Sequence, residues 1–165
     1  MITRRTLFAV FAATLALVAA QHSIAQIVNP TTAQPTLPTE KLQIVTHDGR
    51  KLDFTVEMAV TQDQQTVGLM FRPVVAEGTG MLFDWGRVRG SDMWMRNTVA
   101  SLDMLFINPD GTIRHIAEHA VPQSLAVISS GGEVRGTLEI AAGTAEKLDI
   151  RVGDVVHNSI FGNAP

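Results

Sequence analysis

The chain is organised around the residues from Gly78 to Phe106. This stretch contains Gly-Thr-Gly-Met-Leu-Phe-Asp-Trp (78–85), Gly-Ser-Asp-Met-Trp-Met-Arg-Asn-Thr (90–98) and Ser-Leu-Asp-Met-Leu-Phe (101–106). Both tryptophans of the chain and four of its seven methionines lie in this stretch. Short apolar segments separated by glycines and single polar residues are typical of buried strands joined by tight turns. Large apolar side chains beside clustered polar ones, as around Trp94, also indicate the wall of a pocket.

The hydrophobic pattern on either side of this stretch predicts a mainly β (α+β) fold. We expect a single compact β barrel or sandwich of about eight short strands with two short helices. Alternation of apolar and polar residues predicts a hairpin over 42–60, with its turn at 47–50. Residues 118–130 are irregular around Pro122 or contain a short strand at 125–128. The other expected strands cover 80–85, 93–97, 102–107, 112–117, 136–141 and 155–158.

Two short helices are expected between these strands. Thr61 followed by Gln64 is a capping-box pattern, which predicts a helix that runs to about Met70. Gly68 inside that helix costs roughly 1 kcal/mol relative to alanine, which indicates that another element packs closely there. The second helix is expected at 144–148, after Gly143.

The N-terminal region has the pattern of an export signal. Arg4 and Arg5 precede an apolar run at 7–20, which is shorter than the roughly 20 residues of a membrane span. Ser23-Ile24-Ala25 supplies small residues for cleavage, so 1–25 is expected to be a signal peptide and the mature chain to start at Gln26. A Pro/Thr-rich linker at 26–40, a single β-rich domain at 41–160 and a tail at 161–165 complete the expected organisation.

Composition and charge exclude several classes of function. The 165 residues carry a net charge of −3, and removal of the two N-terminal arginines would make the mature chain more acidic. This balance argues against nucleic acid as a partner, because nucleic-acid binding depends on neutralising phosphates. The chain has no cysteine, which excludes thiol catalysis and thiolate metal sites. We therefore expect a periplasmic or secreted protein with no transmembrane segment after signal removal, and with an unknown small molecule or protein as its partner.

Several blocks of sequence resemble one family, the uncharacterised proteins grouped as domain of unknown function 192. The similarity covers about residues 42–157, and one position departs from the family pattern: Ser101 stands where a proline usually precedes Leu-Asp. The resemblance implies a compact β-rich domain that is often exported, and it implies no known activity. The matching blocks are Gly68-Leu69-Met70-Phe71-Arg72, Gly80-Met81-Leu82-Phe83, Trp94-Met95-Arg96-Asn97-Thr98, Leu102-Asp103, Leu138-Glu139, Gly143 and Gly153-Asp154.

The polar and aromatic members of these blocks are the candidate ligand-binding residues: Arg72, Trp94, Asn97, Thr98, Asp103 and Glu139. Arginine can bind a carboxylate or phosphate through two parallel hydrogen bonds, and asparagine and threonine can bind a ligand or fix a turn. Two interpretations of the set stay open, a buried polar network that fixes loops and a ligand pocket. The leading functional hypothesis is an exported binding or accessory domain rather than an enzyme.

Two other functions are alternatives. Met93 and Met95 beside Trp94 could form a thioether Cu(I) site, although core packing is the favoured explanation of these residues. Asp103 and Glu139 could form the carboxylate pair of a hydrolase. His115 and His119 precede Pro122 in an extended or irregular stretch and are interpreted as separate surface residues, so we expect no metal site and no cofactor.

Asp103 itself lies in a strand with two apolar faces. Leu102, Met104 and Phe106 share one face, and Asp103 shares the other with Leu105 and Ile107. A carboxylate there needs partners to stay charged. The sequence favours Arg72 and the Asn97–Thr98 pair as those partners, with Asp103 at the edge of a pocket.

Overall fold

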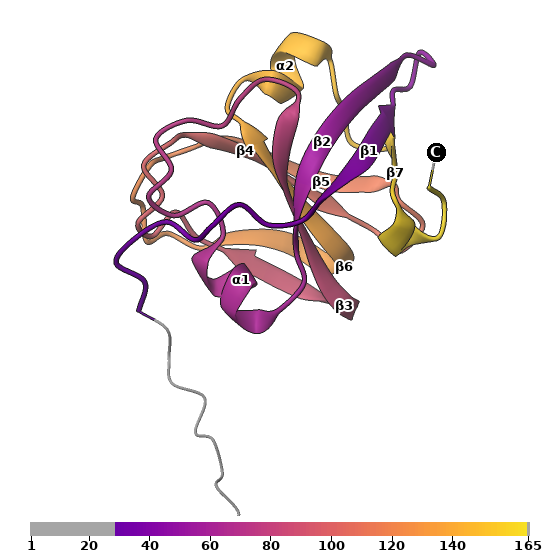
Figure 1. Cartoon of the computed structure of the whole chain (residues 1–165). Helices are drawn as coiled ribbons and strands as arrows, with labels where there is room; N and C mark the ends of the chain where they lie inside the picture. The colour runs from indigo at the N-terminus through magenta and orange to yellow at the C-terminus, as the bar shows by residue number, and fades with distance from the viewer. Residues whose placement is uncertain (1–28, 165) are drawn as a thin grey trace, which may run out of the picture.

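The computed structural model describes residues 29–164, and the expected signal peptide lies outside them (Figure 1). The described part confirms the mainly β fold. Its strands are β1 Thr39–Val45, β2 Lys51–Ala59, β3 Thr79–Met93, β4 Leu102–Ile107, β5 Ile113–Ala120, β6 Ile128–Ala141 and β7 Val155–His157. Its helices are α1 Gln62–Val67, α2 Thr144–Leu148 and the short 3₁₀ helix η1 Ser159–Phe161.

These strands form one strongly curled sheet in the order β5-β4-β6-β3-β2-β1-β7. All neighbouring pairs are antiparallel except β2 and β3, which are parallel. The two edges of the sheet meet at one end through a bridge between Thr112 and Val155. Gly111 permits this contact, because a Cβ there would lie 2.5 Å from the carbonyl oxygen of Val156. The sheet is therefore curled like a barrel, and the sandwich alternative does not apply.

The first helix begins as the sequence predicts and ends earlier. Thr61 caps α1 and forms the capping box with Gln64. The helix stops at Val67 because Gly68 takes a positive φ of 50°, and not near Met70 as expected. The expected close approach at Gly68 is confirmed: a Cβ there would lie 3.1 Å from the ring of Phe83 on β3. In Figure 1, α1 and α2 lie at opposite ends of the sheet.

Both faces of the sheet are buried, and each has its own hydrophobic core. The inner core contains residues from all seven strands, including Leu82, Leu138 and Ile140. The outer core lies on the other face of β3, β4 and β6, and includes Met81, Phe83 and Met95. Because neighbouring residues of a strand point to opposite faces, Glu139 lies on the outer face between two inward-facing residues, Leu138 and Ile140.

Two expected strands differ in the structure. Residues 94–98 form a turn after β3, so the expected strand at 93–97 is wrong. Residues 125–127 are irregular, which was one of the two alternatives for that region, and only Ile128 of the possible strand at 125–128 belongs to β6, which pairs there with the far end of β3. The middle of β3 is exposed on both sides, so it lacks the apolar alternation that marks a strand.

The segment before β1 is in contact with the domain. The Gln34 side-chain amide donates hydrogen bonds to the backbone oxygens of Gln64 and Gly68, at 3.1 and 2.9 Å. The Leu37 amide donates to the Glu57 carboxylate at 2.7 Å. The part of the expected linker that the structure describes therefore runs along α1 and β2, and its last two residues, 39–40, belong to β1.

Candidate functional site

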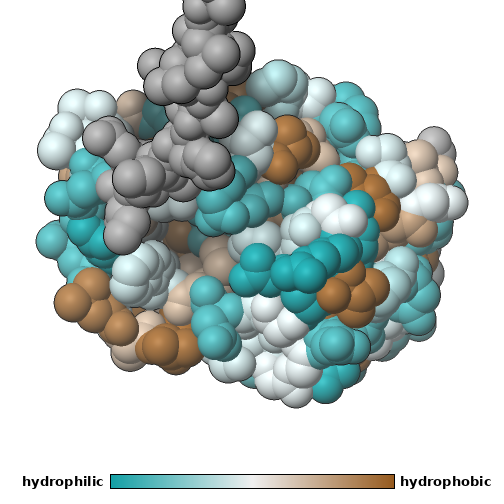
Figure 2. All heavy atoms as spheres, turned by 90° about the horizontal axis from the view of Figure 1, so that it is seen from below, coloured by the Kyte–Doolittle hydropathy of each residue, from teal (hydrophilic) through white to brown (hydrophobic). Residues whose placement is uncertain are grey.

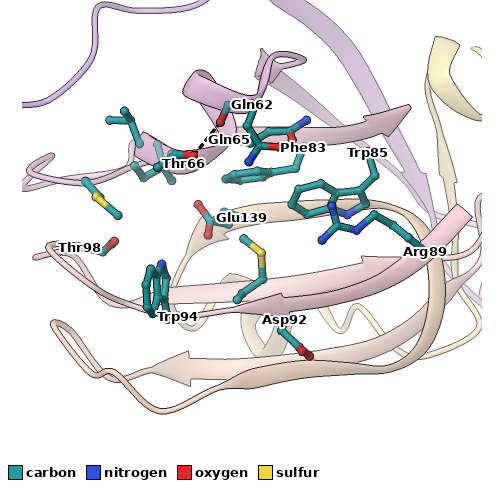
Figure 3. A pocket seen from close by; sticks show the side chains of 15 residues that line it. Gln62, Gln65, Thr66, Phe83, Trp85, Arg89, Asp92, Trp94, Thr98 and Glu139 are labelled. Carbon is teal, nitrogen blue, oxygen red and sulfur yellow. Dashed lines mark hydrogen bonds between the residues drawn. The ribbon is translucent and has the colours of Figure 1, made fainter. Parts of the chain in front are cut away.

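A hollow of about 240 Å³ lies between α1 and the outer face of β3 and β6. Ligand pockets for drug-sized molecules span about 300–1,000 Å³, so this hollow suits a smaller molecule. Figure 3 shows it with α1 on one side, the aromatic residues of β3 on another and Trp94 opposite them. Its lining comprises Gln62, Gln65, Thr66, Val67, Gly68, Leu69, Met70, Phe83, Trp85, Arg89, Asp92, Met93, Trp94, Thr98 and Glu139.

Hydrogen bonds hold α1 over the sheet. The Gln65 side-chain amide donates to the backbone oxygens of Ala59, at 3.1 Å, and Asp84, at 2.7 Å. The tight contact of Gly68 with Phe83 brings the end of α1 against β3. The helix that roofs the pocket is thus tied to both strands beside it, and the pocket is preformed.

Aromatic side chains form the wall on β3. The rings of Phe83 and Trp85 lie 5.6 Å apart between centroids. The Trp85 indole donates to the hydroxyl of Thr137 at 3.2 Å, which fixes its orientation. The Arg89 guanidinium lies over the Trp85 ring, 4.9 Å from its centroid. Trp94 is 47% exposed on the opposite side, so the pocket has an accessible aromatic edge.

Glu139 lies at the floor of the pocket. Its residue is 5% exposed, and its paired neighbours on β3 and β4 are Met81 and Met104. Its carboxyl group accepts no hydrogen bond from any residue in 29–164, and no basic side chain of that range forms an ion pair with it. Burial raises the pKa of Glu139 from 4.5 to about 8. In Figure 3 the carboxyl group points into the space between α1, Phe83 and Trp94.

The other candidate residues divide between this pocket and other places. Trp94 and Thr98 line it together with Glu139. Arg72 does not, because its guanidinium forms a two-point ion pair with Glu57 beside a second hollow. Asn97 holds a turn: it has a positive φ of 56°, and its carbonyl accepts a hydrogen bond from Phe71.

Asp103 lies on the inner face of β4 and is completely buried. One carboxylate oxygen accepts the His119 backbone amide and the other accepts the Ala145 backbone amide, both at 2.9 Å. The expected two-sided burial and the need for partners are confirmed. The expected partners, Arg72 and the Asn97–Thr98 pair, are wrong, and so is the position at a pocket edge. Asp103 joins β5 and the start of α2 to β4.

This geometry does not assemble the carboxylate pair of the hydrolase hypothesis. Asp103 is paired with Ile140, the residue next to Glu139, and the two carboxyl groups lie on opposite faces of the sheet. A glycosidic bond must lie between its two catalytic carboxyl groups. Asp103 and Glu139 therefore cannot act on one substrate.

The sulfur and imidazole groups are also dispersed. Met93 lines the pocket, whereas Met95 is fully buried in the outer core. His115 stacks on Phe106, and His119 lies 3.7 Å from Glu146. Within residues 29–164, no three His, Asp or Glu side chains gather into a potential metal site.

Several lining residues were not among the sequence candidates, notably Phe83, Trp85, Gln65 and Arg89. A signal for two of them was present, because Met81, Phe83 and Trp85 alternate along the expected strand at 80–85, and alternate residues of a strand share a face. Gln65 and Arg89 carry no comparable signal, since both sit in exposed-looking polar sequence.

A family model matches the chain over the region that contains the sequence blocks described above. The model of the DUF192 family, described as uncharacterized ACR, matches residues 43–158. The chain belongs to this family. This DUF192 protein is thus one of a group defined by sequence and not by activity, and no curated protein is significantly similar to it.

Solved structures resemble this DUF192 domain over nearly their full length. A candidate transcription regulator from Sinorhizobium meliloti 1021 is 44% identical, with a TM-score of 0.75 over 78% of this chain and 99% of that chain. A protein of unknown function from Novosphingobium aromaticivorans DSM 12444 is 32% identical, with a TM-score of 0.72 over 77% and 91%. None of the helices in residues 29–164 has the length and apolar content to cross a membrane.

Proposed function

We propose that this protein is an exported binding domain that takes up a small molecule in the pocket between α1 and the outer face of the sheet. The observation that supports the proposal is Glu139, a residue only 5% exposed whose carboxyl group faces the pocket and has no hydrogen-bond partner among residues 29–164. Its oxygens open onto the pocket and are not sealed in the core, because no fully buried side-chain oxygen of those residues lacks a partner. A ligand with a complementary group would supply the hydrogen bonds that a polar group in such a place usually has.

The surface around the pocket supports a small ligand more than a large partner. Figure 2 shows the face that carries α1, and its hydrophobic residues form separate small patches between hydrophilic ones. Protein interfaces usually need a larger continuous contact area. The pocket also contains one buried carboxyl group and no second buried acid, which supports binding rather than acid–base catalysis.

The description of the Sinorhizobium meliloti protein raises DNA binding as another hypothesis. The net charge of −3 argues against direct contact with DNA, because such contacts require a surplus of basic groups.

Export is the second part of our proposal and rests on the pattern of residues 1–25. Mass spectrometry of the protein from its native host should find Gln26 at the N-terminus, outside the cytoplasm. An intact Met1 in the cytosol would contradict export.

Both tryptophans of the chain line the pocket, which gives a specific readout for ligand binding. We expect a screen of small metabolites by NMR to yield ligands that shift the indole signals of Trp85 and Trp94. Trp94→Ala should weaken those ligands at least about tenfold, since a lost aromatic contact of 1.4 kcal/mol has that effect.

Val99→Ala is the matched control, because Val99 is 42% exposed on the same segment and does not line the pocket. Its affinity for each ligand should equal that of the parent protein. Ligands that leave both indole signals unchanged, or that bind Trp94→Ala as well as the parent, would contradict the proposed site.

A further inference from the structure

The acidic floor of the pocket, Glu139, forms no ion pair with any basic side chain of residues 29–164. The arginines around it have other partners. Arg72 is paired with Glu57, and Arg135 on β6 is paired with Asp84. Arg89 lies over the Trp85 ring and donates to the Gly90 carbonyl at 3.0 Å. None of these three arginines is therefore paired with Glu139 to stabilise its ionised form.

Part of the lining of this pocket is apolar and polarizable. Phe83, Leu69 and the thioethers of Met70 and Met93 line the same pocket as Glu139, with Trp94 at the open edge, and polar residues of α1 complete it. Arg96 already lies over the Trp94 ring, 5.5 Å from its centroid, so the tryptophan offers a new ligand mainly its apolar contact. Such a lining accommodates a short hydrocarbon or aromatic group beside one charged group.

We propose that the ligand of this pocket is a small organic cation, an alkyl- or arylalkyl-ammonium whose nitrogen donates hydrogen bonds to Glu139. Its apolar part would lie against Phe83, Met93 and Trp94. This inference rests on the proposed function, because it specifies the ligand class for the same pocket. Charge-assisted hydrogen bonds of this kind are the strongest that a side chain makes, and they are stronger in a buried site than in water.

Binding should be coupled to loss of a proton from Glu139. Burial raises the pKa of Glu139 to about 8, so the Glu139 carboxyl group of the free pocket is mainly protonated at pH 7. An ammonium group favours the ionised carboxylate and lowers the pKa. The other charged groups that border the pocket are Arg89 and Asp92 on β3, with Arg96 just beyond; the α1 residues of the lining are uncharged. Affinity should therefore rise about tenfold per pH unit up to about pH 8 and level off above it.

Three probes of similar size and different charge test this inference: benzylammonium, benzyl alcohol and benzoate. By calorimetry at pH 8, benzylammonium should bind at least tenfold more tightly than benzyl alcohol, and benzoate should bind most weakly. At pH 7, titrations in buffers of different ionisation enthalpy should show release of nearly one proton per benzylammonium. Equal affinity for benzylammonium and benzyl alcohol, or no proton release, would overturn the inference.

Glu139→Gln keeps the shape of the side chain and removes its charge, so it should abolish the preference for benzylammonium over benzyl alcohol and the proton release. Glu133→Gln is the matched control on the same strand, where Glu133 is exposed and outside the pocket; it should leave both unchanged. If none of the three probes binds while other molecules shift the indole signals, the cation inference fails and the proposed function stands. If no molecule shifts those signals, both fail.

Discussion

Asp103→Ala should lower the free energy of unfolding by about 3 to 5 kcal/mol. The substitution removes the acceptor of two backbone amides, those of His119 and Ala145, at a completely buried position. The hydrogen bond from Ala145 is buried and the one from His119 is partly buried. A buried donor that loses its partner costs about 1–3 kcal/mol, and bonds to a charged group are at the upper end. Because these bonds join β4 to β5 and α2, no single element can relax to replace them.

Denaturant unfolding of Asp103→Ala and the parent protein measures this loss. Asp92→Ala is a suitable control, since Asp92 is exposed on β3, and it should change the stability by no more than about 0.5 kcal/mol. A loss near 1 kcal/mol for Asp103→Ala would mean that water reaches the two amides. The role of Asp103 in the scaffold would then be wrong.

The second large effect concerns Glu139→Gln and depends on pH. The pKa of Glu139 is 4.5 in its ordinary state and about 8 in the fold. Between these two values the folded protein keeps the proton and the unfolded chain releases it. The stability that protonated Glu139 contributes to the fold is therefore complete below pH 4.5 and is lost as the pH rises toward 8. Each pH unit in that window is worth about 1.4 kcal/mol. The glutamine of the variant does not ionise, so the variant does not lose stability in this way. Its free energy of unfolding minus that of the parent should increase by up to about 5 kcal/mol between pH 4.5 and pH 8.

Subtracting the free energy of unfolding of the parent from that of the variant at each pH leaves only the effect of Glu139. Other carboxyl groups have a lowered pKa, such as Asp84 beside Arg135. Those groups make both proteins more stable as the pH rises, and they cancel in the comparison. Glu133→Gln should give a difference from the parent that does not change with pH. A flat difference for Glu139→Gln as well would show that Glu139 ionises as an ordinary surface glutamate.

The pattern of apolar residues predicted the parts of the fold that are buried on one or both faces. The hairpin at 42–60 and the strand at 102–107 agree closely with β1, β2 and β4. The far part of β3 escaped prediction because Gly86, Arg87 and Val88 are exposed and show no alternation. Met93-Trp94-Met95 imitates a strand, yet Trp94 stays exposed and Met95 is buried in a turn.

The candidate site was predicted in part. Trp94, Thr98 and Glu139 do meet in one pocket, although 41 positions in sequence separate Thr98 from Glu139. The partners of Asp103 were beyond sequence reasoning, because they are backbone amides and every residue except proline has one. Sequence also could not show that Glu139 has no partner among residues 29–164, since this depends on which arginines the fold directs to other acids.

The fold loses stability by placing the carboxyl group of Glu139 in the outer core, and this loss is our reason for assigning Glu139 a function. A leucine or methionine at this site would avoid placing a carboxyl group in the outer core. Departures from the packing rules of this kind are expected at functional or strained sites. The ionisation of Glu139 is therefore the quantity on which the binding proposal depends.

The most direct measurement follows the carboxyl carbon of Glu139 by NMR as the pH is changed, with and without saturating benzylammonium. The account predicts a midpoint near pH 8 in the free protein and a clearly lower midpoint in the presence of the ligand. A midpoint near pH 4.5 in the free protein, or one that the ligand does not move, would contradict it.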